Sequence, residues 1–251
     1  MGEDVLGGGE RLRMPTAFIW DFDGTLADTR LRNYHIVRRL LADTAGGLDR
    51  FPALATPETY DRVQRRHVNW RDLYTREFGF SDAETDRLGS LWSEYQLAEP
   101  TPAAVFDGLG DVLHGLRGAA HGVVSQNARS QILRTLEHAG LASLFGAVLG
   151  YDSVHLARQK PAPDGFLACL AALSPHPPRR IVGVGDHETD VRCARNAARA
   201  LAERGVDCAC VTIAVCFVDG VDPAAWAERP DHVARAPADI LRIAREQRLD
   251  A

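Results

Sequence analysis

Lysine is almost absent from this sequence: of its 29 basic residues, 28 are arginine and only Lys160 is lysine. Acidic residues outnumber basic ones, and the formal net charge of −5 offers no basic surface of the kind that binds nucleic acid. Long apolar runs are also missing. Without eighteen consecutive apolar residues, we expect no transmembrane helix and no membrane partner.

Cysteine is scarce, and several familiar motifs are incomplete. Five cysteines form an odd count in a chain long enough to build a hydrophobic core, which favours reduced thiols and a cytoplasmic location. Residues 1–14 lack the apolar segment of a secretory signal, so we predict a loose tail there. Gly183-x-Gly185 lacks the third glycine of a dinucleotide site, and no glycine-rich loop ends in Gly-Lys-Ser/Thr.

The densest chemistry lies just after the short β-prone stretch Thr16–Trp20. Asp21 and Asp23 follow it directly, with Gly24 and Thr25 behind them. Two unpaired carboxylates cannot lie in a core, because burying them costs several kcal/mol unless a cation or donors meet them. Such a loop supplies oxygen ligands for a hard cation such as Mg²⁺, and its backbone N–H groups can bind phosphate.

The next part of the sequence has only helical patterns. We predict helices over residues 31–42, 57–78 and 81–97, with no strand between them. A Glu-Pro-Thr-Pro segment at 99–102 closes this block, because proline does not continue a helix. The domain prediction is therefore an α-helical insert over 31–102, with 15–30 and 103–251 forming a second domain.

Beyond residue 103, helical and strand patterns alternate. This alternation predicts an α/β fold with a Rossmann-like, mostly parallel sheet that binds ligands at the carboxyl ends of its strands. Residues 216–230 look like an extra surface excursion with no assignable role. The predicted helices are 105–116, 130–138, one beginning at Asp164, 191–204 and 237–247; the predicted strands after the first are 122–124, 145–149, 180–184 and 208–215.

Three polar signals follow predicted strands. Ser125 and Gln126 precede Asn127 after one strand, and their hydroxyl and amide groups suit phosphate oxygens. Asp186 and Asp190 follow another strand, four residues apart, where they share a helix face and repel unless a divalent cation lies between them.

The third signal is Lys160, because this sequence uses arginine for every other positive charge. A compact ammonium group is needed where a wider guanidinium would displace its neighbours. At about 4 Å from an oxyanion such a charge is worth about 4 kcal/mol in an effective dielectric near 20.

Taken in order, Asp-x-Asp-Gly-Thr, a strand-terminal Ser, Lys-Pro and Gly-Asp-x-x-x-Asp resemble the haloacid dehalogenase superfamily of phosphatases. The helical insert after the first motif resembles the small α-helical cap of the subclass that includes phosphoglycolate phosphatase. The resemblance covers about Phe18 to Arg242. Gln126 departs from it, because relatives often carry Asn at this position.

The resemblance implies a Mg²⁺-dependent hydrolysis of a small phosphate monoester through an aspartyl-phosphate. Asp21 would be the nucleophile, and Asp23 the general acid and base. The metal ligands would be Asp21, Asp23 through its carbonyl, Asp186 and, in support, Asp190. The expected phosphate-binding residues are Gly24, Thr25, Ser125, Gln126 and Lys160.

Substrate choice is expected to lie in the helical cap, with Arg66, His67, Trp70 and Arg71 as candidates to face the pocket. The expected partner is a small phosphate ester, not nucleic acid or membrane, and the expected state is a monomer or homodimer. Three alternatives stay open: a sugar phosphomutase, another phosphotransferase on the same core, and a non-catalytic binding or regulatory module. Asp23 argues against the last, because pure binding would not require it.

Overall fold

The computed structural model describes residues 16–250, so the tail predicted over residues 1–14 lies outside the described residues. The chain divides into two compact units. One contains the chain up to Ala27 together with Val105 onward, and the other is Asp28–Ala104. Both crossings between the units fall within two short strands that pair with each other, β2 (Ala27–Asp28) and β3 (Ala104–Val105).

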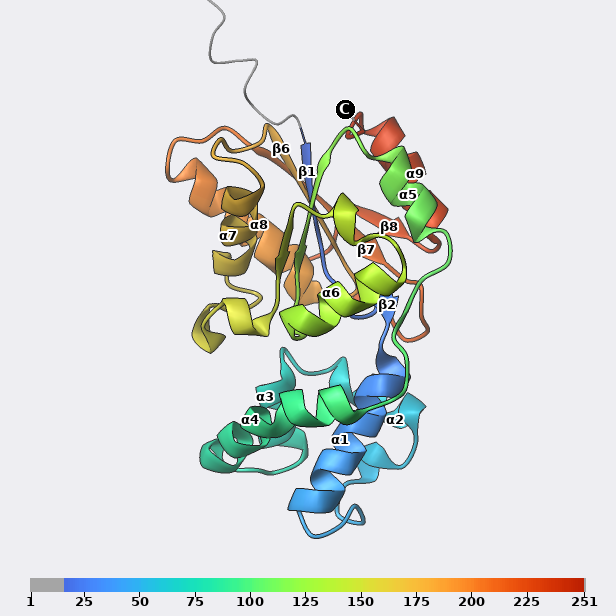
Figure 1. Cartoon of the computed structure of the whole chain (residues 1–251). Helices are drawn as coiled ribbons and strands as arrows, with labels where there is room; N and C mark the ends of the chain where they lie inside the picture. The colour runs from blue at the N-terminus through green and yellow to red at the C-terminus, as the bar shows by residue number, and fades with distance from the viewer. Residues whose placement is uncertain (1–15, 251) are drawn as a thin grey trace, which may run out of the picture. The chain divides into compact units, whose positions relative to one another are not determined.

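The larger unit is built on a six-stranded parallel sheet with the order β5-β4-β1-β6-β7-β8 (Figure 1). This arrangement confirms the predicted Rossmann-like α/β fold. Its strands are β1 (Thr16–Trp20), β4 (Ala120–Val124), β5 (Ala147–Leu149), β6 (Arg180–Gly185), β7 (Ala209–Val215) and β8 (His232–Ala234). Its helices are α5 (Leu109–Gly115), α6 (Arg129–His138), α7 (Asp164–Leu173), α8 (Glu188–Ala202) and α9 (Pro237–Glu246), with 3-10 turns η3 (Ala142–Leu144), η4 (Tyr151–Ser153), η5 (Leu156–Arg158) and η6 (Pro223–Ala225).

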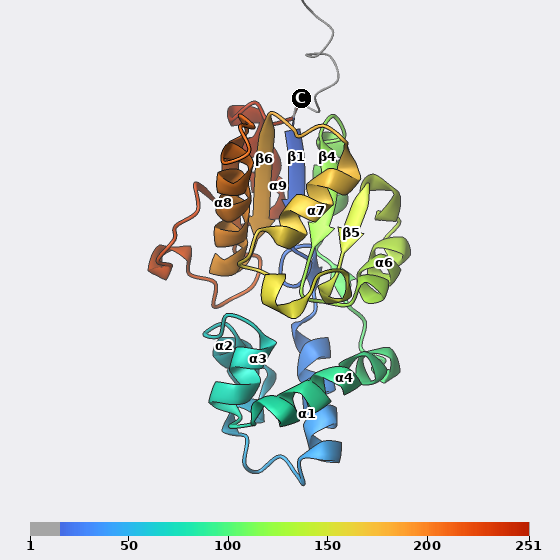
Figure 2. The ribbon, with the colours of Figure 1, turned by 90° about the vertical axis from the view of Figure 1, so that its left-hand side faces the viewer.

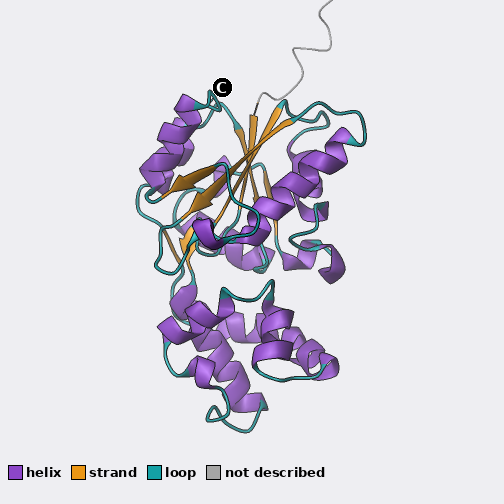
Figure 3. Cartoon of the chain, turned by 180° about the vertical axis from the view of Figure 1, so that it is seen from behind, coloured by secondary structure: helices purple, strands orange, loops and turns teal. Residues whose placement is uncertain are grey.

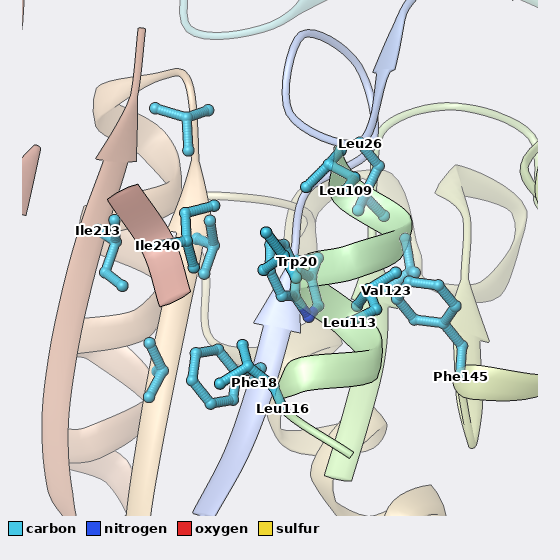
Figure 4. Packing of buried hydrophobic residues seen from close by; sticks show 14 of the residues in the cluster. Phe18, Trp20, Leu26, Leu109, Leu113, Leu116, Val123, Phe145, Ile213 and Ile240 are labelled. Atoms are coloured by element: carbon cyan, nitrogen blue, oxygen red, sulfur yellow. The ribbon is translucent and has the colours of Figure 1, made fainter. Parts of the chain in front are cut away.

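The central strand β1 is apolar along its whole length because helices cover both faces of the sheet. Phe18 and Trp20 point to the face covered by α5, α6 and α9, where they are fully buried (Figure 4). Ala17 and Ile19 pack in a second cluster with residues of α7 and α8, the helices that cover the opposite face of the sheet in Figure 2. Burying each large side chain stabilises the fold by about 1.5–3 kcal/mol, so β1 is firmly held where its carboxyl end enters the polar loop.

The smaller unit is helix and loop between β2 and β3 (Figure 3). It has a hydrophobic cluster of its own, in which Tyr34 and Leu41 pack with an aromatic group that includes Phe51 and Tyr74. A separate core is typical of an independent domain. Its elements are α1 (Arg30–Thr44), η1 (Pro52–Leu54), α2 (Pro57–Gln64), α3 (Trp70–Asp72), the π-helical turn η2 (Leu73–Glu77) and α4 (Asp82–Ala98).

The prediction of one helix over 57–78 is wrong, because α2 ends at Gln64 and a new helix begins at Trp70. Asn69 is extended, and its side chain accepts a hydrogen bond from the backbone N–H of Asp72 at 3.0 Å. The Asp72 carboxylate in turn lies 3.1 Å from His67 Nδ1. These local side-chain bonds compete successfully with a continuous helical ladder.

The helix predicted over 105–116 starts too early, because α5 begins only at Leu109 after Gly108 takes the left-handed backbone conformation. The sequence predicts a surface excursion over residues 216–230 and no strand after it, so strand β8 is missed.

Asp231 fixes the end of this excursion next to β8, since its carboxylate accepts hydrogen bonds from the N–H and hydroxyl of Thr212 at 2.8 and 2.7 Å. Across residues 16–250, none of the helices has the length and apolar character needed to cross a membrane.

Candidate active site

The loop after β1 turns sharply at the carboxyl edge of the sheet. Asp21 still belongs to the ladder, because its N–H donates to the carbonyl of Val184 in β6 at 2.8 Å. Phe22 is fully buried, and its carbonyl accepts from the N–H of Ala27 at 3.0 Å, which closes the loop. Anchoring Phe22 in the core holds the two flanking aspartates at the edge of the sheet.

Gly24 is required in this loop for two reasons. Its φ is +73°, in the region that glycine adopts without strain. A Cβ at this position would also lie 2.2 Å from Oδ2 of Asp186, so the backbone and that carboxylate are packed directly together. Thr25 beside it is fully buried, and its hydroxyl has no hydrogen-bond partner among residues 16–250. The Asp186 carboxylate, which follows β6, therefore packs directly against the loop that carries Asp21 and Asp23.

Asp23 is held by two side chains from the loop after β4. The hydroxyl of Ser125 lies 3.2 Å from Asp23 Oδ2, and the amide Nδ2 of Asn127 donates to Asp23 Oδ1 at 2.9 Å. The backbone N–H of Asn127 donates to the Ser125 hydroxyl at 3.1 Å. Ser125 and Asn127 are both buried. The loop after β1 and the loop after β4 thus meet at Asp23.

Lys160 joins the remaining motifs. Its Nζ lies 2.6 Å from Asp21 Oδ1 and 2.6 Å from Asp190 Oδ1, and all three side chains are largely buried. The other oxygen of Asp190 accepts from the N–H of His187 at 3.1 Å, at the start of α8. Asn196 of α8 donates to the carbonyl of Pro161 at 2.8 Å and fixes the Lys160 loop to this helix.

Burial and charge act in opposite directions on this group. Burial raises the pKa of Asp21 well above its usual value; Lys160 opposes this effect, while the carboxylates of Asp190, Asp186 and Asp23 add to it. Burial alone would lower the pKa of Lys160, but Asp190 and Asp21 raise it above its usual value, so the ammonium stays charged. One ammonium facing several carboxylates leaves an excess of negative charge.

The side chains fit a divalent cation. Asp21, Asp186 and Asp190 are buried, and each offers a carboxylate oxygen within 4.8 Å of the others. Carboxylates are the ligands that Mg²⁺ prefers, and a divalent cation would offset the mutual repulsion that raises the pKa of Asp21. Both oxygens of Asp190 already have partners in Lys160 and His187, which fits a supporting role for Asp190 at such a site.

The four predicted cap residues differ in their surroundings within the helical unit. His67 lies against Asp72, and Arg71 pairs with Asp82 and Asp86. Trp70 is half-buried and packs edge-on against Tyr74. Arg66 is exposed in the turn after α2. Three of the four are therefore engaged in packing or ion pairs, and Arg66 is the exposed one.

Sequence reasoning underrated Asn127, which was noted beside Ser125 but not predicted as a site residue. The pattern Ser125-Gln126-Asn127 held the signal, since a buried amide two residues after the strand-terminal Ser reaches Asp23. Gln126 lies between them, and its buried amide nitrogen has no hydrogen-bond partner in the described part of the chain. Which of the two amides faces Asp23 depends on loop geometry that spacing does not encode.

Comparison with known proteins decides the family. The model of the family described as "haloacid dehalogenase-like hydrolase" matches residues 18–202 of the chain. The chain belongs to the haloacid dehalogenase-like hydrolase family. This membership confirms the resemblance seen in the ordered motifs.

Two phosphatases are among the curated proteins similar to the chain. The phosphoglycolate phosphatase of Synechococcus elongatus is 28% identical over 229 residues, which cover 90% of this chain and 95% of that protein. The pyrophosphatase PpaX of Listeria monocytogenes is 24% identical over 192 residues, covering 72% of this chain and 79% of PpaX.

A solved structure has a similar fold. CbbY from Rhodobacter sphaeroides, determined in complex with phosphate, superposes with a TM-score of 0.66 at 18% identity, covering 90% of this chain and 96% of CbbY.

Proposed function

We propose that this protein is a Mg²⁺-dependent phosphatase that hydrolyses a small phosphate monoester through an aspartyl-phosphate. The observation that carries the proposal is the convergence of Asp21, Lys160 and Asp186 at one edge of the sheet, with Asp23 beside them. The names of the curated relatives support a phosphate ester as the substrate class. The same convergence supports Asp21 and Asp23 as the catalytic pair.

In the first step, a carboxylate oxygen of Asp21 attacks phosphorus, and the bond from phosphorus to the ester oxygen breaks. Asp23 gives its proton to that leaving oxygen, so the product leaves as a neutral alcohol. In the second step, Asp23 takes a proton from water as the water oxygen attacks the same phosphorus. The bond to Asp21 breaks, and inorganic phosphate leaves.

The protein's own groups position and neutralise the phosphoryl oxygens, which is most of what this chemistry requires. Lys160 supplies a fixed positive charge beside the Asp21 oxygen that attacks. Asp190 orients Lys160 through its 2.6 Å contact. Ser125, Thr25, Gln126 and the backbone of Gly24 are the further proposed phosphate contacts. Mg²⁺ bound by Asp21, the Asp23 carbonyl and Asp186 would neutralise developing negative charge.

The helical unit is proposed to act as a cap that chooses the substrate. Arg66 is the leading candidate there, because this exposed arginine can pair with a second anionic group such as a carboxylate or phosphate. The relatives named for phosphoglycolate and pyrophosphate act on compounds that carry such a group. The cytoplasmic location and the monomeric or homodimeric state stay predictions.

A direct test measures phosphate release from p-nitrophenyl phosphate and from a panel of small phosphate esters. We expect release with Mg²⁺, none with chelator, and none from Asp21→Asn in a protein that keeps the wild-type circular dichroism spectrum. Formation of an isomeric sugar phosphate without net phosphate release would favour a phosphomutase. Ligand binding without turnover of any compound would favour a binding module.

A further inference from the structure

The side chain of Asn127 is hydrogen-bonded at both its amide nitrogen and its amide oxygen. Its side chain links Asp23 to the start of α6, since Nδ2 donates to Asp23 Oδ1 at 2.9 Å while its own Oδ1 accepts from the N–H of Ala128 at 2.8 Å. The second bond settles the orientation of the amide, because only the oxygen can accept. The group facing Asp23 is therefore an N–H donor.

The backbone of Asn127 is fixed as well. Its N–H donates to the Ser125 hydroxyl at 3.1 Å, and its carbonyl accepts from the N–H of Tyr151 in η4 at 3.0 Å. Gly150 is pressed against the same carbonyl, where a Cβ would lie 2.5 Å from the Asn127 oxygen. A buried side chain held at both its amide and its backbone has little freedom to follow a moving partner.

These contacts make the two oxygens of Asp23 different. An amide N–H can only donate, so Asp23 Oδ1 must accept at this position. A hydroxyl can rotate and either donate or accept, so the Ser125 hydroxyl beside Oδ2 tolerates a proton on that oxygen. Of the two Asp23 oxygens, Oδ2 is therefore the one whose neighbour is compatible with a bound proton.

We propose that Asn127 is a positioning residue for proton transfer: its amide holds the Asp23 carboxyl in one rotamer and assigns the transferable proton to Oδ2. This inference rests on the proposed phosphatase reaction and adds a residue to it. Proton donation by Asp23 matters most when the leaving oxygen is strongly basic, because a weakly basic leaving group departs without protonation. Loss of the Asn127 donor should therefore slow the hydrolysis of esters with strongly basic leaving groups more than that of esters with weakly basic ones.

The test uses a series of aryl phosphates that differ only at the para position: p-nitrophenyl, phenyl and p-methylphenyl phosphate. The decisive variant is Asn127→Leu, which is close to asparagine in size, has no N–H to donate to Asp23 and adds no charge. We expect kcat/KM to fall about 100-fold for phenyl and p-methylphenyl phosphate and less than about 10-fold for p-nitrophenyl phosphate. Asn127→Ala should show the same steepened dependence.

Gln131→Ala is the matched control, because it removes another buried amide, one whose bond runs to Thr135 within α6. Its dependence on the leaving group should equal that of the wild type. If the Asn127 variants lose the same factor with all three esters, or none, the positioning role is refuted while the phosphatase stands. If the wild type hydrolyses no ester, the proposed function itself fails. Should Asn127→Ala not fold, Asn127→Leu alone decides.

Discussion

Replacing Lys160 by methionine removes the positive charge that lies in contact with both Asp21 and Asp190. Each contact is 2.6 Å long, which at an effective dielectric near 20 corresponds to about 6 kcal/mol of attraction before desolvation is subtracted. Because desolvation offsets much of this, the measured cost of breaking a buried ion pair is about 3–5 kcal/mol. We expect a loss of this size in the free energy of unfolding at pH 8.

The difference in the free energy of unfolding between Lys160→Met and the wild type should become smaller at acidic pH. Lys160 opposes the upward shift of the pKa of Asp21, so removing it raises that pKa further above the unfolded value. A carboxyl group with a raised pKa in the folded state favours folding below its unfolded pKa and loses that contribution as pH rises through the folded pKa. The variant should therefore recover stability relative to the wild type as pH falls from about 8 to about 5.

The assay is urea unfolding of both proteins in chelator at several pH values. Lys160→Arg is the companion variant, because it keeps the charge but not the compact ammonium. It should retain more stability than Lys160→Met and still lose at least about 100-fold in kcat/KM. Equal stability of Lys160→Met and wild type at pH 8, with the same pH dependence, would refute the reasoning.

Three further outcomes are expected. Gly24→Ala should lose activity and lower the melting temperature by more than Gly140→Ala, since both glycines have positive φ but only a Cβ at Gly24 would meet Asp186, at 2.2 Å. Mg²⁺ should raise the melting temperature of the wild type, and this rise should vanish in Asp186→Asn while the fold persists. Burial lowers the pKa of His121, whose ring accepts from Trp20 Nε1 at 3.1 Å, so stability should fall as pH drops from about 7 toward the lowered folded pKa. His121→Phe should flatten that slope, and an unchanged slope in urea titrations would show that another group is responsible.

The location of the site was predictable from sequence because parallel strands carry their carboxyl ends to one edge. Asp21, Ser125 and Asp186 each follow a strand that the apolar pattern identified, and β4, β1 and β6 are neighbours in the sheet. The contacts of Lys160 were not predictable in detail. It was expected to face phosphate, and the structure places it between Asp21 and Asp190, an arrangement set by the loop before α7 and its attachment to α8.

The errors in the fold have local causes. The apolar spacing over 57–78 continues through a break that Asn69 and Asp72 create with side-chain hydrogen bonds, which hydrophobic periodicity does not register. Strand β8 is only three residues long and lies at the edge of the sheet. Its position depends on Asp231 reaching Thr212, nineteen residues away, and a local pattern cannot reveal such a contact.

The central claim is that Asp21 carries the phosphoryl group during turnover. Mixing the enzyme with p-nitrophenyl phosphate and Mg²⁺, quenching in acid within the first turnover and digesting the protein allows the labelled peptide to be found by mass spectrometry. We predict one added phosphoryl group on Asp21, removable by hydroxylamine as expected for an acyl phosphate. A phosphoryl group on any other residue, or turnover without a covalent adduct in a rapid-quench series, would contradict this account.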